Sequence, residues 1–192
     1  MARDKTLIQW KRARLTCHRF GKLCLLLSLI VMPSATPPDL FQQIRLGVAL
    51  DDIDEATLLG QLQNLNEYGQ TLLHEAISHA QPDYALFLLD KGIDVQPADY
   101  QGATALHFAA FYRLAAVTDR ILARHGNPNA ADQHGNTPLW VAVFNARGEY
   151  SMVQRLLNAG ADPTRKNRYG KSPGDFAQQI KDDVLLRLLS SR

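Results

Sequence analysis

Residues 99–131 read DYQGATALHFAAFYRLAAVTDRILARHGNPNAA, and the same pattern returns before and after this stretch at a fixed spacing. Gly69, Gly102 and Gly135 lie 33 residues apart, and Gly170 follows 35 residues later. Each of these glycines comes three residues after an Asn or Asp and two residues before a Thr or Ser. A period of 33 residues indicates a chain built from one repeated supersecondary unit.

Inside each repeat, the glycine predicts a tight turn and the hydroxyl residue predicts the start of a helix. Glycine adopts the positive φ of such a turn without a steric penalty. A hydroxyl oxygen two residues later is placed to accept from the free N–H groups of a first helical turn. The four hydroxyl residues are Thr71, Thr104, Thr137 and Ser172.

Two apolar stripes follow the turn in every repeat. In the repeat quoted above, Leu106, Ala109 and Ala110 have the i, i+3, i+4 spacing of one helix face, and Val117 and Ile121 begin a second stripe. Neither helix is able to bury its stripe alone. Neighbouring repeats are therefore expected to stack into a solenoid.

The motifs GATALHFAA and GNTPLWVAVFNARGEYSMVQRLLNAGADP resemble those of the ankyrin-repeat family, and the resemblance covers about residues 39–192. It implies an all-α solenoid of stacked helix-turn-helix units with short turn or hairpin tips. We expect three full repeats, an N-terminal cap and a C-terminal cap. The repeats are residues 66–98, 99–131 and 132–166, and the caps are residues 39–65 and 167–192.

Some positions depart from the family pattern. Arg113 and His125 stand where glycine usually ends a helix, and because Gly126 follows His125 we expect that turn to be shifted by one residue. Two extra residues near Ala146 and Arg147 account for the 35-residue spacing. In the N-terminal cap, the apolar residues predict two short helices that pair with each other, the second containing Leu58, Leu59 and Leu62.

Residues 1–32 differ in character from the rest. Seven Lys or Arg among residues 1–22 precede the apolar run of residues 23–32, and residues 33–38 form a Pro-rich spacer. The apolar run matches the core of a secretory signal and is about half of what a membrane-spanning helix needs. The alternative is a mis-assigned start, with translation beginning at Met32. The first interpretation predicts an exported product, periplasmic or membrane-anchored, and the second a cytoplasmic one.

Charge and motifs argue against several classes of function. Residues 1–22 carry a net charge of +6, so the other residues of this +2 chain carry −4, which argues against general nucleic-acid binding. Cys17 and Cys24 both precede the repeats, so no disulfide framework or zinc spacing is expected there. The resemblance implies that His74 and His107 are structural. We expect no catalytic residue, cofactor or metal.

The resemblance also implies a recognition surface, the concave face, formed by the turn tips and the exposed side of each repeat's first helix. Aromatic residues dominate interface hot spots, so their presence there indicates a binding surface. An alternative for the two phenylalanines is that they pack inward under the loops. The candidate partner-binding residues are Tyr68, Tyr100, Gln101, Phe111, Tyr112, Gln133, His134, Phe144, Asn145, Arg168, Tyr169 and Lys171.

A basic cluster surrounds the last tip. It either steers an acidic partner or contacts phosphate, or it is simply a solvated loop. Its members are Arg165, Lys166, Arg168 and Lys171.

Ankyrin domains bind proteins, so the resemblance implies a non-catalytic, monomeric protein-binding module. The third repeat looks like those of bacterial ankyrin proteins, some of which are encoded beside secreted toxins and act as immunity or accessory partners. An alternative is an exported envelope scaffold that protects a periplasmic enzyme. Membrane contact is expected only if residues 1–32 are retained.

The two interpretations of residues 1–32 predict different mature N-termini. A secretory signal predicts a product that begins near Thr36 and lies outside the cytoplasm. A start at Met32 predicts a cytoplasmic product beginning MPSATPP or PSATPP. N-terminal sequencing after cell fractionation distinguishes them, and an intact chain beginning at Met1 in the membrane fraction would contradict both.

Overall fold

The computed structural model describes residues 39–50 and 53–190, and ten helices run through them. Residues 1–32, with their two interpretations, and the spacer up to residue 38 lie outside the described ranges. Apart from one isolated bridge between Ala98 and Thr104, these ranges contain no β-structure, so the predicted all-α class is confirmed. The helices are α3 (Leu40–Arg45), α4 (Glu55–Gln61), α5 (Leu72–Ser78), α6 (Pro82–Asp90), α7 (Ala105–Phe111), α8 (Ala115–Ala123), α9 (Pro138–Phe144), α10 (Ser151–Asn158), α11 (Pro173–Gln179) and α12 (Asp183–Ser190).

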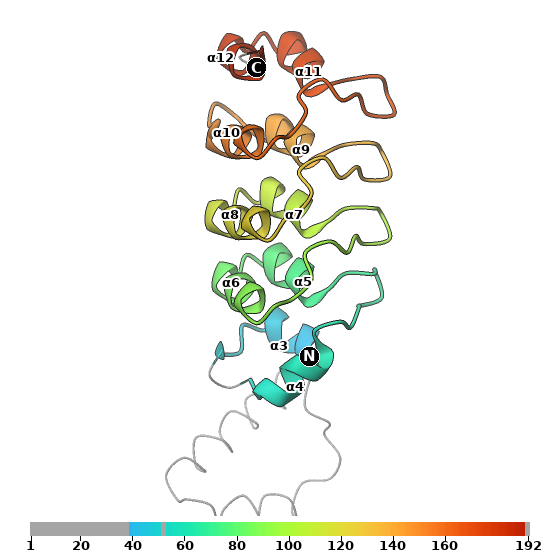
Figure 1. The fold of residues 1–192 in the computed structure, drawn as a ribbon, viewed down its shortest axis with the longest axis vertical. Helices are drawn as coiled ribbons and strands as arrows, with labels where there is room; N and C mark the ends of the chain where they lie inside the picture. Colours follow the sequence, from blue (N-terminus) through green and yellow to red (C-terminus); the bar gives the residue numbers. More distant parts are fainter. Residues whose placement is uncertain (1–38, 51–52, 191–192) are drawn as a thin grey trace, which may run out of the picture. The chain divides into compact units, whose positions relative to one another are not determined.

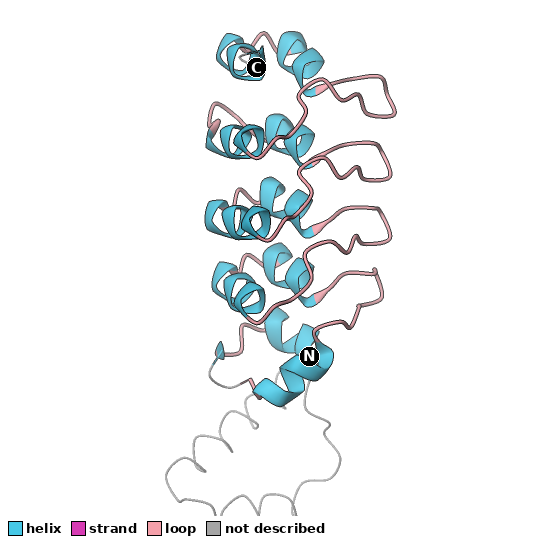
Figure 2. Cartoon of the chain, in the orientation of Figure 1, coloured by secondary structure: helices cyan, strands magenta, loops and turns pink. Residues whose placement is uncertain are grey.

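From α5 onward the helices stand in two columns (Figure 1). The first helices of successive repeats, α5, α7, α9 and α11, pack on one another, and the second helices, α6, α8, α10 and α12, form the other column. Figure 2 shows the loops before each first helix reaching out to one side as the tips. This arrangement is the predicted solenoid of stacked helix pairs.

Fully buried leucines at equivalent positions form the centre of the core. Leu73, Leu106 and Leu139 are at most 1% exposed, one in each full repeat. Ala76 and Ala109, buried beside them, add little volume and so let neighbouring helices approach closely. Because the buried stripes of adjacent repeats face each other, each repeat depends on its neighbours for burial.

Residues other than glycine take up the positive φ of two helix ends in the second repeat. Arg113 has a φ of 56° and His125 a φ of 62°, so the expectation that the second turn is shifted to Gly126 is wrong. Ala80, equivalent to Arg113, has a φ of 53°. A side chain in this region costs on the order of 1 kcal/mol, which the packing of the flanking helices must offset.

A side-chain donor on each first helix binds the tip of the next repeat. His74 Nδ1 accepts from the backbone N–H of Thr71 at 3.2 Å, so the ring proton sits on Nε2, 3.3 Å from the carbonyl oxygen of Ala103. His107 makes the same pair of contacts, with the Asn136 carbonyl oxygen 3.1 Å from Nε2. Both histidines are therefore structural, as the resemblance implied.

In the third repeat, Trp140 replaces the histidine and keeps its bond to the next tip. The indole Nε1 donates to the carbonyl oxygen of Lys171 at 3.3 Å. Tryptophan has a donor but no ring acceptor. The helix start is instead capped by the Thr137 hydroxyl, which accepts from the backbone N–H of Trp140 at 3.2 Å. The substitution thus preserves the contact between repeats and changes the local cap.

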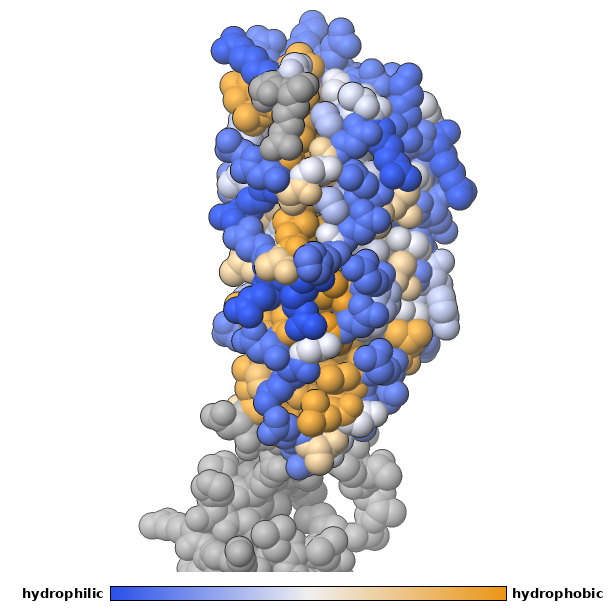
Figure 3. Space-filling view, in the orientation of Figure 1, coloured by the Kyte–Doolittle hydropathy of each residue, from blue (hydrophilic) through white to orange (hydrophobic). Residues whose placement is uncertain are grey.

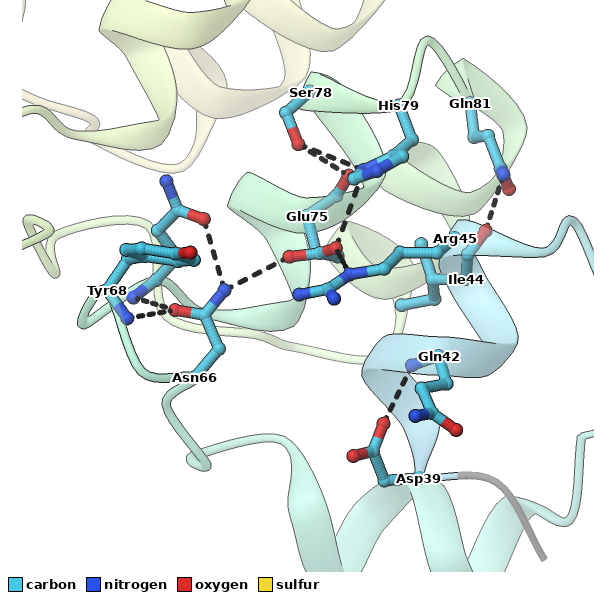
Figure 4. Close-up of polar contacts among 11 residues, drawn as sticks. Asp39, Gln42, Ile44, Arg45, Asn66, Tyr68, Glu75, Ser78, His79 and Gln81 are labelled. Carbon is cyan, nitrogen blue, oxygen red and sulfur yellow. Dashed lines mark hydrogen bonds and ion pairs between the residues drawn. The ribbon is translucent and has the colours of Figure 1, made fainter. Parts of the chain in front are cut away.

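The N-terminal cap is joined to the first repeat by a buried carboxylate (Figure 4). Glu75 is 2% exposed, and its carboxylate accepts from the Arg45 guanidinium of α3 and, at 3.1 Å, from the Asn66 side-chain amide. His79 Nδ1 lies 3.5 Å from the same carboxylate. A buried charge is tolerated when several donors satisfy it, so this network ties α3, the first tip and α5 together.

The cap differs from its prediction in its second helix. Instead of standing in the column of second helices, α4 lies below α3 (Figure 1) and packs less closely on it than the paired helices of the full repeats do on each other. Leu58 is buried, but Leu59 is exposed, contrary to expectation. The end of the stack therefore shows apolar side chains around α3 and α4 (Figure 3), including Leu46 and Leu65.

The stacked core predicts a large effect of one leucine. Leu106→Ala is expected to lower the free energy of unfolding by on the order of 2–5 kcal/mol, because it removes buried surface and leaves a cavity. Thr104→Ala is expected to lower it by about 1 kcal/mol through the loss of the cap on α7. Urea unfolding followed by circular dichroism measures both, with the exposed Gln101→Ala as control. Near-wild-type stability for Leu106→Ala would show that this packing is wrong.

The buried histidines predict a loss of stability in mild acid. Burial lowers the pKa of His74 from about 6.5 to about 4 and also lowers the pKa of His107. The unfolded chain therefore binds these protons first. Stability is unaffected above the unfolded pKa and falls as pH drops from about 6.5 toward 4, by up to about 3 kcal/mol for His74.

Urea midpoints measured across this pH window test the assignment. His74→Gln should flatten the pH dependence, whereas Gln133→Ala, at an exposed tip position without a titratable group, should leave it unchanged. Equal slopes for wild type and His74→Gln would contradict it.

Candidate functional site

The tips are rigid turns that present side chains outward. In the second repeat, Asp99 Oδ1 accepts from the backbone N–H groups of Gln101 and Ala103, each at 2.9 Å, and Gly102 has a φ of 78°. Asn66, Asp132 and Asn167 make the equivalent bonds in the other tips. An Asx side chain that hydrogen-bonds the backbone of its own turn stabilises the path of the tip.

Adjacent tips are also bonded to each other. The backbone N–H of Tyr100 donates to the Tyr68 carbonyl oxygen at 3.0 Å, and Gln133 N–H donates to the Gln101 carbonyl oxygen at 2.7 Å. Arg168 N–H donates to the His134 carbonyl oxygen at 2.9 Å. The four tips therefore form one continuous platform, so their side chains keep fixed spacings before any partner arrives.

The tip side chains among the candidate residues are all exposed. Tyr100 is 76% and Tyr169 73% exposed, and Tyr68 is more than half exposed. Tyr100 lies over the tip glycine of the preceding repeat, where a Cβ on Gly69 would come within 2.6 Å of its ring. His134 and Tyr169 stack at 6.5 Å between ring centroids. The remaining exposed tip candidates are Gln101, Gln133, Arg168 and Lys171.

On the first helices, the structure exposes the two phenylalanines. Phe111 is 53% and Phe144 56% exposed, so the alternative that they pack inward under the loops is wrong. Tyr112 packs edge-on against Phe111 at 5.1 Å and is also exposed. Asn145 is only partly exposed, and its side-chain amide donates to the Val141 carbonyl oxygen at 3.1 Å, so it is less available to a partner than its neighbours.

Sequence reasoning missed a cluster of three aromatic rings at the end of this face. Trp140, Phe144 and Phe176 come from α9 and α11, and their ring centroids lie 5.4 to 5.6 Å apart. Trp140 and Phe176 are partly exposed. The available signal was tryptophan at a position that holds histidine in the two preceding repeats, because an indole is too large to be buried under one tip.

The outer helices present a different surface. Their charges pair between successive units: Lys91 with Glu55, Arg120 with Asp90, and Arg155 with Asp119. Each pair is open to solvent and adds little stability. The charges of these side chains are nevertheless balanced within the protein. Exposed aromatic rings concentrate on the concave face, whereas in the second-helix column Asp90 pairs with Arg120 and Asp119 pairs with Arg155.

Residues 39–50 and 53–190 contain no group of three or more His, Cys, Asp or Glu placed to hold a metal ion. None of their helices combines the length and hydrophobicity that crossing a bilayer requires. A pocket of about 510 Å³ lies near the N-terminal cap, lined by residues that include Phe41, Arg45 and Glu67. Its one guanidinium already binds Glu75.

Comparison with known proteins yields matches within the stacked repeats. A family model for ankyrin repeats (3 copies) matches residues 96–167, and a second model for ankyrin repeats (many copies) matches residues 73–113. Protein PhlB from Serratia liquefaciens is 39% identical over 111 residues, which is 57% of this chain and 48% of PhlB.

Other relatives are larger proteins. Tyrosine-protein kinase Shark from Drosophila melanogaster is 31% identical over 59% of this chain and 12% of its own length. Rabankyrin-5 from Mus musculus is 34% identical over 64% of this chain and 12% of its own length. The chain thus spans about half of PhlB and a small part of the other two.

The matches and the geometry agree. The matched residues run from α5 to α10 and include the turns at Gly102 and Gly135 and the bonds from His74 and His107 to the next tip. Ankyrin repeats are protein–protein interaction modules and are in general not catalytic. From the stacked helix pairs and these matches together, residues 73–167 of the chain are ankyrin repeats.

Proposed function

We propose that this chain acts without catalysis, as a monomeric, stoichiometric binder of another protein through the concave face. The observation that carries the proposal is the distribution of aromatic side chains. Rings at the tips and on the first helices are exposed and held on a rigid platform, with Tyr100 at 76% and Phe144 at 56%. Rigid, exposed aromatic side chains lose little entropy on binding and dominate interface energies.

The histidines favour binding over catalysis in this proposal. His74 and His107 use both ring nitrogens for contacts within and between repeats. A general base needs a free nitrogen within reach of a substrate proton and a pKa near the working pH. Burial instead lowers the pKa of His74 to about 4. An enzymatic function would require turnover that disappears on changing these histidines while the fold survives.

For the biological role, we propose an immunity or accessory partner of a bacterial toxin or enzyme. This extends the resemblance of the third repeat to bacterial ankyrin proteins, and the identity with PhlB is compatible with it. The second candidate is an exported envelope scaffold that protects a periplasmic enzyme. It is favoured by the basic and apolar pattern of residues 1–32, and the compartment of the mature protein decides between them.

The test is a double substitution on the concave face. Tyr100→Ala with Tyr112→Ala should keep the unfolding profile and weaken binding of the partner by about thirtyfold or more, because truncated anchors commonly cost 2 kcal/mol or more. The partner is captured with the wild-type chain, identified by mass spectrometry, purified and titrated by calorimetry.

Val184→Ala is the matched control, since it truncates an exposed apolar side chain of α12 in the other column. It should bind the partner as the wild type does. If the double variant bound the partner with wild-type affinity, the concave face would not be the binding surface. The second helices would then be tested next.

A further inference from the structure

The tips change charge along the stack. The first tip carries Glu67, the second carries Asp99, and the third carries Asp132 and His134. The last tip carries Arg168 and Lys171 and no acidic residue. Arg165 and Lys166 precede the last tip, and all four basic side chains are exposed. Because the tips are bonded in sequence, this difference runs in a fixed direction along the concave face.

The basic cluster is only partly neutralised by its surroundings. Within residues 39–50 and 53–190, no carboxylate forms a close ion pair with Lys166, Arg168 or Lys171. Asp175 accepts from the backbone N–H of Ser172 at 2.9 Å and also interacts through space with Lys166 and Lys171, as Asp162 does with Arg165. Two carboxylates offset part of the charge of four cations, and the excess positive charge attracts an anion from outside.

The cluster adjoins the three-ring site described above. The indole N–H of Trp140 donates to the carbonyl oxygen of Lys171, so the last tip is bonded to one ring of the cluster. Phe144, the most exposed of the three rings, is flanked by Trp140 at 5.5 Å and Phe176 at 5.4 Å. One end of the concave face therefore offers an apolar seat and a cationic rim within the same pair of repeats.

The opposite end of the face has another chemistry. Glu75 occupies the helix position that Phe108, Val141 and Phe176 hold in the other repeats, and its charge is already matched by Arg45. An apolar side chain placed there would meet a polar network rather than rings. Because the two ends differ, a bound segment is expected to have a different affinity in one direction than in the reverse direction.

We propose, on the basis of the proposed function, that the partner presents a protein segment with apolar side chains beside a run of carboxylates. The apolar side chains seat on Trp140, Phe144 and Phe176, and the carboxylates meet Arg168 and Lys171. The rings supply affinity by burial, whereas the cations set the direction and raise the association rate. The partner's acidic run therefore points to the C-terminal end of the stack.

The test uses synthetic fluorescein-labelled peptides that share one Leu- and Phe-containing centre and carry a flank of glutamates, serines or lysines. Binding to the full chain is followed by fluorescence anisotropy at low and at physiological salt. We expect the glutamate peptide to bind on the order of tenfold more tightly than the serine peptide at low salt, with a smaller ratio at higher salt. The lysine peptide should bind most weakly.

Variants separate the two parts of the site. Arg168→Glu with Lys171→Glu should abolish or reverse the preference among the flanks, and Phe144→Ala should weaken all three peptides alike. Arg147→Glu with Arg187→Glu is the matched control, because it makes the same charge change at exposed positions outside the cluster. That control should keep the glutamate preference.

Each remaining outcome overturns the inference. If the three peptides bound equally, the basic side chains would not select an acidic flank. If the wild-type chain bound the peptides no more tightly than the Phe144→Ala variant does, the three rings would not be the apolar binding site. Tighter binding of poly-U RNA than of the glutamate peptide, lost in the tip variant, would assign the cations to nucleic acid. The proposed function is tested separately from these three outcomes. It stands if the purified partner binds the wild-type chain and does not bind the variant with Tyr100→Ala and Tyr112→Ala.

Discussion

In the residues that the structure describes, the helices of a repeat complete the burial of their apolar stripes against neighbouring repeats, and the rest of the structure depends on that constraint. Leu106 is buried because α7 packs between α5 and α9 as well as on α8. Stacking then fixes the distance between repeats, and this spacing lets His74, His107 and Trp140 reach the next tip. The tips are therefore ordered by the core, although none of their exposed side chains contributes to it.

Stability and the proposed recognition consequently rest on separate residues. The buried positions are apolar or satisfied by hydrogen bonds, whereas the side chains of Tyr100 and Tyr169 extend from turns closed by Asp99 and Asn167. A change at the end of a tip side chain leaves the Asx turn and its glycine intact. The surface can thus vary widely in sequence while the helix pairs stay the same.

The periodic features of the fold were predictable because they repeat. The spacing of Gly69, Gly102 and Gly135 and the hydroxyl residues that follow them located the turns and helix starts. Two details failed. His125, and not its neighbour Gly126, takes the positive φ, because His125 holds the helix-end position that Gly92 and Gly160 hold in the flanking repeats. The place of α4 depends on being at the end of a stack, which no local pattern encodes.

The candidate site was predictable to a similar degree. The repeat frame identified the tips and the exposed sides of the first helices, and Phe111 and Phe144 are exposed there. It missed Trp140 and Phe176, because the frame assigns their positions to packing. Only the three-dimensional neighbourhood of α9 and α11 shows that the rings meet. A sequence pattern within one repeat does not show which side chains of different repeats contact each other.

Trp140 gives this surface an optical property. It is the one tryptophan in the described residues, partly open to solvent and in contact with two phenylalanines beside the last tip. Indole emission shifts to shorter wavelength when water leaves the ring. The chain therefore carries its own fluorophore at the edge of the concave face, and the emission of Trp140 changes whenever a molecule covers that end, without any label attached.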